Sequence, residues 1–297
     1  MAGKMNAKVE FGDFQTPQGL ASDVCAVIQR TGFSPASIIE PTCGRGAFIL
    51  AALDAFPSAS HFLGVDQNAG YVREATRATN DIRHDRQIRL QQGDFFDTDW
   101  MGVVAKLPKP ILVVGNPPWV TNAALGSLGS ANLPSKANED NLRGIDALTG
   151  KSNFDISEWM LRKNIQWLAD APGMLAVLCK TAVARKVMLY AWSQDLPIES
   201  AEVRRIDAKL HFGASVDACL LLLRLRPNAS SRECSDYGTL QSTEPDAIFG
   251  LRDGSLVADV RLYDPRSGSW TRVVQAETKH WRGFPADFRN CGAVPEG

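Results

Sequence analysis

Residues 37–48 read Ser37-Ile38-Ile39-Glu40-Pro41-Thr42-Cys43-Gly44-Arg45-Gly46-Ala47-Phe48. The first four are typical of a short buried strand, and the apolar, alanine-rich stretch from Ala47 to about Phe56 predicts a helix. A glycine turn between a strand and a helix lets a nucleotide-like ligand lie against bare backbone. Because Gly-x-Gly after a strand is common, this turn alone is weak evidence for a ligand site, and residues at other strand ends must support the assignment.

Two downstream apolar segments supply that support. Residues 61–66 end on Asp66, a carboxylate suited to ribose hydroxyls, and residues 89–95 end on Asp94-Phe95, an acid–aromatic pair suited to an adenine. Open α/β sheets bind ligands at the carboxyl ends of their strands. These strand ends, in this order, predict a nucleotide-type site at one edge of a sheet.

The apolar run at residues 111–115 leads directly into Asn116-Pro117-Pro118-Trp119. A nitrogen conjugated to a ring is a poor nucleophile, and two acceptors aimed at its N–H groups favour the pyramidal form that can attack. Asn116 Oδ1 and the Pro117 carbonyl are the expected acceptors, on a turn that proline stiffens. Trp119 is expected to stack on the ring that carries the amine. The alternative is an ordinary strand exit with a packed tryptophan.

Taken together, these motifs resemble the ordered motifs of S-adenosylmethionine-dependent N6-adenine DNA methyltransferases of restriction–modification systems. Two further elements extend the resemblance over roughly residues 11–226. Phe14-Gln15-Thr16-Pro17 is similar to the Thr-Pro element that this group carries ahead of the glycine turn. His211-Phe212-Gly213 is similar to the aromatic element that contacts the flipped base.

The resemblance implies a role for each matching residue. The expected catalytic residues are Asn116, Pro117, Pro118 and Trp119, and the expected base-stacking residues are Trp119 and Phe212. The residues expected to bind S-adenosylmethionine are Thr16, Pro17, Glu40, Pro41, Cys43, Gly44, Gly46, Phe48, Asp66, Asp94, Phe95 and Asn116. The implied reaction moves a methyl group to N6 of an adenine taken out of the duplex, because that atom is inaccessible within the stack.

The predicted fold class is α/β. The resemblance implies a Rossmann-like class I methyltransferase sheet, mostly parallel with an antiparallel closing strand, plus a small C-terminal β-containing appendage. Residues 1–226 are expected to form the cofactor-binding catalytic domain, with the apolar strand 216–225 central in its sheet. Residues 227–244 are expected to be a linker. Residues 245–297, with a hairpin signal around Asp253-Gly254, are expected to be a reduced or truncated target-recognition part.

Composition favours a cytoplasmic enzyme. Hydrophobic residues make up 44% and charged residues 22% of the 297 residues, which are ordinary globular values. No apolar stretch approaches the ~20 residues of a membrane span, and the N-terminus has no apolar signal core. The six cysteines form no Cys-x-x-Cys pair and the four histidines show no ligand spacing. We therefore expect buried, reduced thiols and no metal.

The expected partner is DNA that presents an adenine. A net charge of −1 gives no global attraction to phosphate, and the residues after 226 are few for a full target-recognition domain. A cognate restriction or specificity subunit is therefore a further expected partner.

Other functions stay open, two enzymatic and one non-enzymatic. Methyltransferases that act on a protein glutamine amide (N5) or on guanine N2 of ribosomal RNA also carry Asn-Pro-Pro-aromatic. Those families mostly show an acidic Asp-x-Gly-x-Gly turn and lack the Thr-Pro element. A non-enzymatic alternative is a cofactor-binding subunit of a defence complex, against which the intact turn at Asn116–Trp119 argues.

Overall fold

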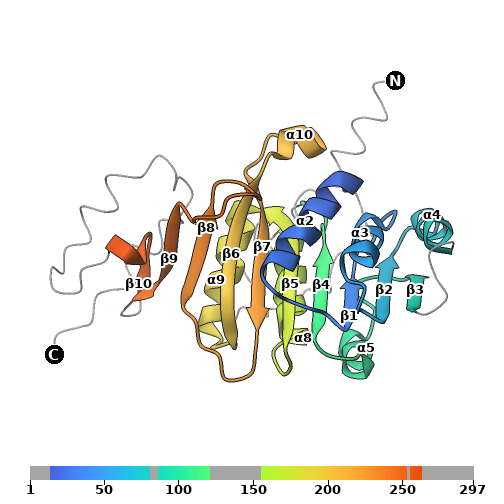
Figure 1. Cartoon of the computed structure of the whole chain (residues 1–297), viewed down its shortest axis with the longest axis horizontal. Coiled ribbons are helices and arrows are strands. Elements are labelled where there is room, and N and C mark those ends of the chain that lie inside the picture. The colour runs from blue at the N-terminus through green and yellow to red at the C-terminus, as the bar shows by residue number, and fades with distance from the viewer. Residues whose placement is uncertain (1–13, 81–85, 121–154, 253–254, 263–297) are drawn as a thin grey trace, which may run out of the picture.

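The computed structural model describes residues 14–80, 86–120, 155–252 and 255–262, and a ten-stranded sheet forms its centre (Figure 1). From edge to edge the strand order is β10-β9-β8-β6-β7-β5-β4-β1-β2-β3. The strands are β1 (Ser37–Glu40), β2 (His61–Asp66), β3 (Gln87–Gln92), β4 (Ile111–Gly115), β5 (Gly173–Lys180), β6 (Ile198–Ile206), β7 (Ala218–Leu225), β8 (Glu233–Tyr237), β9 (Ala247–Arg252) and β10 (Ser255–Val257). The helices are α2 (Gln18–Arg30), α3 (Ala47–Ala55), α4 (Ala69–Asn80), α5 (Trp100–Lys106), α8 (Ile156–Trp167), α9 (Thr181–Ser193), α10 (Ala208–Phe212) and the short η1 (Val260–Leu262).

The strands around β1 are parallel and the closing pair is not. β1 pairs in parallel with β2 and β4, β2 with β3, and β4 with β5. β7 runs antiparallel to both β5 and β6 and lies between them. The predicted class I sheet with an antiparallel closing strand is confirmed, as is the central place of the apolar strand that ends at Leu225.

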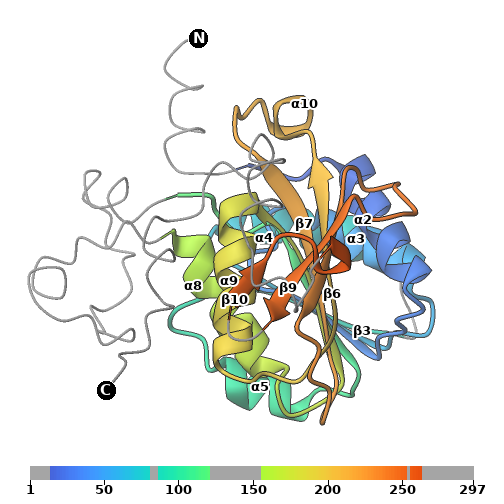
Figure 2. The same cartoon turned by 90° about the vertical axis from the view of Figure 1, so that its left-hand side faces the viewer.

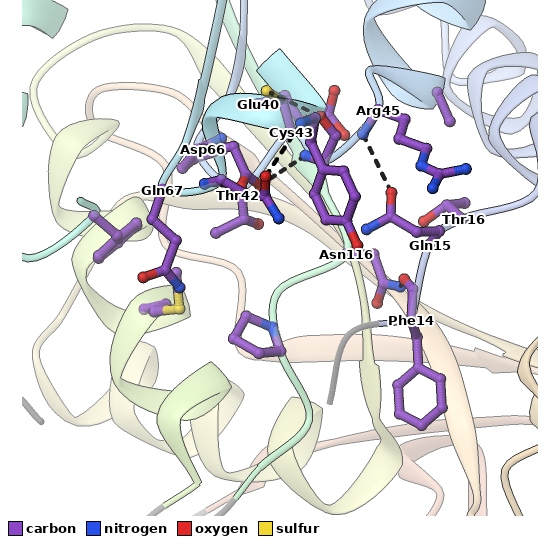
Figure 3. Close-up of a pocket in the computed structure, with 18 of the residues that line it drawn as sticks. Phe14, Gln15, Thr16, Glu40, Thr42, Cys43, Arg45, Asp66, Gln67 and Asn116 are labelled. Carbon is purple, nitrogen blue, oxygen red and sulfur yellow. Dashed lines mark hydrogen bonds between the residues drawn. The ribbon is translucent and has the colours of Figure 1, made fainter. Parts of the chain in front are cut away.

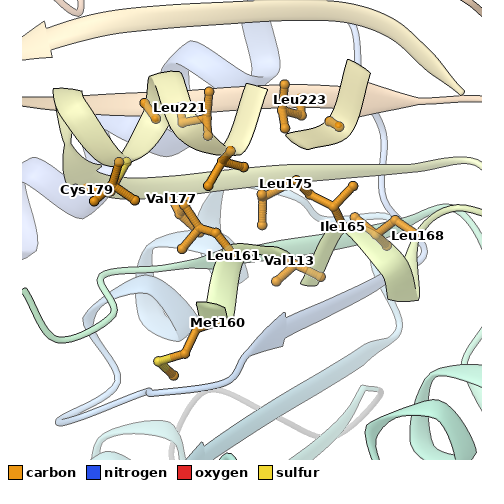
Figure 4. Packing of buried hydrophobic residues seen from close by; sticks show 14 of the residues in the cluster. Val113, Met160, Leu161, Ile165, Leu168, Leu175, Val177, Cys179, Leu221 and Leu223 are labelled. Carbon is orange, nitrogen blue, oxygen red and sulfur yellow. The ribbon is translucent and has the colours of Figure 1, made fainter. Parts of the chain in front are cut away.

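Both faces of the sheet are covered by helices, which explains why the central strands are continuously apolar. The neighbours Ile38 and Ile39 are both fully buried and point to opposite faces, Ile38 toward α2 and α3 and Ile39 toward α5, α8 and α9. On the second face, Leu161 and Ile165 of α8 pack over Val113 of β4 (Figure 4). None of the described helices is long and apolar enough to cross a membrane.

The residues after β7 continue the same sheet. β8 lies inside the segment 227–244 and pairs in parallel with β6, with Ser235 opposite Glu202. The expected linker is therefore wrong. The strand was missed because its short, alternating pattern buries only Cys234 and Asp236 and shows no apolar run. The predicted hairpin is confirmed as the antiparallel pair β9–β10. It adds two strands to the sheet beyond β8 (Figure 2).

Candidate active site

A cavity of about 740 Å³ opens where β1, β2 and β4 end (Figure 3). Its volume is within the range of about 300–1,000 Å³ typical of small-molecule sites. Most residues that the sequence assigned to the cofactor lie in its wall, together with Pro118. They are Thr16, Pro17, Glu40, Pro41, Cys43, Gly44, Asp66, Asp94, Phe95 and Asn116. The parallel strands thus bring motifs that are far apart in the sequence to one edge.

The turn between β1 and α3 needs glycine at two positions. Gly44 and Gly46 have φ of 49° and 81°, in the left-handed region that L side chains rarely adopt. A Cβ on Gly46 would lie 2.9 Å from the Ala75 Cβ, and one on Gly44 would lie 2.6 Å from Gln15 Oε1. The turn therefore has no room for a side chain at Gly46, and at Gly44 that space is taken by the Gln15 amide, which itself lies in the cavity wall.

Asp66 joins the end of β2 to this turn. Its Oδ2 accepts a hydrogen bond from the Gly44 N–H, and its Oδ1 accepts one from the Asn68 N–H, each at 2.8 Å. The carboxylate also lies in the cavity wall. Asp66 therefore fixes the glycine turn in addition to any contact with a ligand.

Glu40 lies at the end of β1 and is only 3% exposed. Its Oε2 accepts a hydrogen bond from the Ile49 N–H in the first turn of α3, at 3.1 Å. Burial raises the pKa of the Glu40 carboxyl well above its ordinary value, and the negative charge of Asp66 adds to the effect, while the Ile49 N–H opposes it. With Asp66 and Asp94 in the same wall, the cavity suits a ligand that carries positive charge.

Asp94 and Phe95 form the wall at the end of β3. Asp94 Oδ1 accepts a hydrogen bond from the Phe96 N–H at 2.8 Å. Phe95 is 6% exposed, and its ring is held from behind by tryptophans. The ring centroids lie 5.7 Å from Trp100, 5.9 Å from Trp159 and 5.6 Å from Trp167. Packing against these three rings therefore fixes the position of the Phe95 ring in the wall.

Asn116 follows β4 and has one satisfied and one unsatisfied polar atom. Its Nδ2 donates to the Phe14 carbonyl at 3.1 Å, which fixes the orientation of the amide. Its Oδ1 is buried and has no hydrogen-bond partner among the described residues. An unmet buried acceptor costs ~1–3 kcal/mol. This arrangement suits a site in which a ligand N–H supplies the missing donor.

The expected base-stacking rings lie beside the cavity rather than in its wall. Trp119 is 6% exposed, and its indole N–H donates to the Leu178 carbonyl at 3.3 Å. The Trp119 ring lies 5.2 Å from that of Phe212, at 75°, and Phe14 contacts both at 5.7 and 5.9 Å. Stacking on a base would require these rings to separate, so that role stays a prediction.

Three other expected residues also lie outside the wall of the cavity. Phe48 is fully buried in the core between α2, α3 and the sheet, because its position on α3 faces inward. The structure therefore does not support Phe48 as a cofactor contact. Gly46 and Pro117 shape the turns on either side without lining the cavity.

Several wall residues were not predicted from the sequence. They include Phe14, Gln15, Thr42, Arg45, Gln67, Asn68 and Tyr71. Asn68 Oδ1 accepts hydrogen bonds from the Gly70 and Tyr71 N–H groups at the start of α4. A sequence signal was present, since asparagine is among the residues preferred at a helix N-cap. The sequence placed Phe14 next to the Thr-Pro element but gave no indication that it lines the cavity.

Within the described part of the chain, no cluster of histidine, cysteine or acidic side chains is placed to hold a metal ion. The five described cysteines are all buried, as expected, and none of them is in a disulfide. Cys291 lies outside the described residues.

Comparison with known proteins gives a relative in sequence. No protein-family model matches the chain. The chain is 40% identical over 253 residues to the type II methyltransferase M.NspV of Nostoc sp., a match that covers 85% of this chain and 52% of that protein. The chain thus spans about half the length of this curated relative.

Solved structures share the fold at low sequence identity. A protein from Listeria monocytogenes described as a class I S-adenosylmethionine-dependent methyltransferase is 13% identical, with 77% of this chain and 67% of that chain covered and a TM-score of 0.50. The M protein of the type I restriction enzyme EcoKI is 16% identical, with 75% and 48% covered and a TM-score of 0.50. The fold is therefore that of the class I methyltransferases.

Proposed function

Because this chain has the class I S-adenosylmethionine-dependent methyltransferase fold and is a relative of a type II methyltransferase, we propose that it methylates N6 of adenine in DNA. The proposed setting is a restriction–modification or phage-defence system. The observation that carries the proposal is Asn116 Oδ1, a buried acceptor beside the cavity with no partner among the described residues.

The cavity fits S-adenosylmethionine. The bound cofactor would supply a methyl group on a positively charged sulfur, and the carboxylates of Asp66 and Asp94 in the cavity wall complement that charge. The glycine turn allows close approach of the ligand to the backbone, because Gly44 and Gly46 carry no side chain. These residues bind and orient, which is where most of the rate is expected to arise.

The Asn-Pro-Pro-Trp turn (residues 116–119) would hold the target amine. Asn116 Oδ1 accepts one amine N–H, and the Pro117 carbonyl is the proposed second acceptor. Two acceptors favour the pyramidal nitrogen whose lone pair can attack, and they stabilise the positive charge that develops on it. The Phe14 carbonyl contributes by fixing the Asn116 amide, since its hydrogen bond leaves Oδ1 to face the amine.

An adenine would reach this turn by leaving the duplex, at a cost of a few kcal/mol. Trp119 and Phe212, with Phe14 beside them, are proposed to separate and stack on the flipped base, each stacking contact being worth ~1–3 kcal/mol. In the structure these three rings contact one another and form one apolar cluster.

One labelling experiment tests the proposal. The chain is incubated with methyl-labelled S-adenosylmethionine and, separately, with duplex DNA, RNA and cell protein, and the products are identified by mass spectrometry. We expect label in DNA as N6-methyladenine, and labelling slower by ~100-fold or more with Asn116→Ala. Label on a protein glutamine or on guanine N2 would support the other enzyme families instead. Cofactor binding without transfer to any of the three would support a non-catalytic subunit.

A further inference from the structure

The last residue of the Asn-Pro-Pro-Trp turn and the residue after it are hydrogen-bonded to two elements, β5 and α8. The Ile156 N–H donates to the Val120 carbonyl at 3.0 Å, which ties the residue after the turn to the start of α8. The Trp119 indole donates to the Leu178 carbonyl of β5. β4 and β5 are parallel neighbours, so the turn and the end of β5 share one edge of the sheet. The turn is thus held by both α8 and β5.

An ion pair connects these two supports. Lys180 Nζ, at the end of β5, lies 2.8 Å from Asp155 Oδ2, and the two side chains are 26% and 8% exposed. The other oxygen of Asp155 accepts hydrogen bonds from the Ser157 N–H at 3.0 Å and from its hydroxyl at 2.6 Å. Asp155 therefore caps α8 and binds the end of β5 at the same time.

We propose that Lys180 is a positioning residue for the Asn-Pro-Pro-Trp turn. By holding Asp155, Lys180 fixes the start of α8 and, through the Ile156–Val120 hydrogen bond, the path of the chain as it leaves the turn. A misplacement of about 1 Å at a reacting centre can lower a rate about 100-fold. Removing Lys180 would also leave a buried carboxylate unpaired, which favours movement of the segment that carries it.

The chain offers a matched control on the same helix. Arg162 pairs with Glu158 at 2.7 Å, and these side chains are 20% and 3% exposed, similar to the Lys180–Asp155 pair. This second pair lies within α8 and Glu158 has Lys186 as a further partner. Arg162→Met therefore breaks a comparable ion pair while leaving the exit of the turn intact.

The test compares Lys180→Met, Lys180→Arg and Arg162→Met in the full chain by hydrogen–deuterium exchange. We expect exchange at the Ile156 amide to rise at least tenfold in Lys180→Met and to stay within twofold of the wild type in Arg162→Met. Affinity for S-adenosylmethionine, measured by calorimetry, should stay within threefold. In the DNA assay, kcat should fall at least tenfold in Lys180→Met, while KM for the cofactor stays within threefold of the wild type. Lys180→Arg should keep most of the wild-type kcat.

Unchanged exchange at Ile156 in folded Lys180→Met would overturn the proposal, as would an equal rise in Arg162→Met, since either result leaves Lys180 without a specific role. If Lys180→Met does not fold, Lys180→Gln is measured in the same way. The exchange readout needs no methyl acceptor, although the kcat arm rests on the proposed function. A wild type that methylates no DNA, together with tenfold faster exchange in Lys180→Met, would overturn the DNA proposal and support the positioning role.

Discussion

At the scale of single residues, Asn116 is the group on which methyl transfer should depend most. Asn116→Ala removes the buried acceptor and the hydrogen bond to Phe14, so we expect kcat to fall by ~100-fold or more, as for loss of a preorganised polar contact at a reacting centre. Affinity for S-adenosylmethionine should stay within a few-fold, because the Asn116 amide is proposed to contact mainly the target amine. Calorimetry and a transfer assay check both. More than about a tenth of wild-type kcat in the variant would contradict the assigned role.

Glu40 should make the stability of the protein depend on pH. In the unfolded chain its carboxyl ionises near its ordinary pKa of 4.5, whereas burial raises the pKa well above this in the folded chain. Between these two values the folded state holds a proton that the unfolded state has lost, so the free energy of unfolding decreases as pH rises through this window. We expect Glu40→Gln, which cannot ionise, to lose less thermal stability than the wild type as pH rises above the ordinary pKa of 4.5.

Thermal unfolding across that range measures the effect, and Glu74→Gln is the control. Glu74 is 51% exposed and pairs with Arg45 on the surface, so its removal should leave the wild-type pH dependence in place. Equal slopes in the wild type and Glu40→Gln would mean that the buried carboxyl does not titrate in this window.

At the scale of elements, the ends of β2 and β3 should set cofactor affinity. Asp66 ties the glycine turn to β2, and Asp94 lies in the wall at the end of β3. Charged hydrogen bonds are worth ~1.5–3 kcal/mol, so Asp66→Ala and Asp94→Ala should each raise Kd for S-adenosylmethionine about tenfold or more. Single-turnover rates of the saturated complex should change much less in Asp94→Ala than in Asn116→Ala. Wild-type affinity in both aspartate variants would show that the cofactor binds elsewhere.

At the scale of the whole molecule, DNA binding by this chain alone should be weak and nearly indifferent to sequence. The net charge is −1, and β8, β9 and β10 extend the central sheet instead of forming a separate DNA-reading module in the described residues. Few phosphate contacts imply a shallow salt dependence, since log K falls with a slope of ~0.9 per neutralised phosphate. A partner subunit should restore a defined site. Titration of random and varied duplexes at several salt concentrations tests this expectation. Nanomolar, sequence-selective binding at physiological salt would refute it.

The sequence by itself determined the strand ends, the glycine turn and the Asn-Pro-Pro-Trp turn, because each depends on a few consecutive residues with special backbone or hydrogen-bonding properties. Contacts between distant segments required the folded chain. Asn116 is oriented by Phe14, and Lys180 meets Asp155, through packing that no local pattern encodes. The strand β8 was not predicted for the same reason. Its own residues show only a weak strand pattern, and its pairing with β6 is a contact between distant segments. The sequence also could not show that the Phe48 side chain lies in the core. Which face of α3 is buried depends on how the helix packs against the sheet.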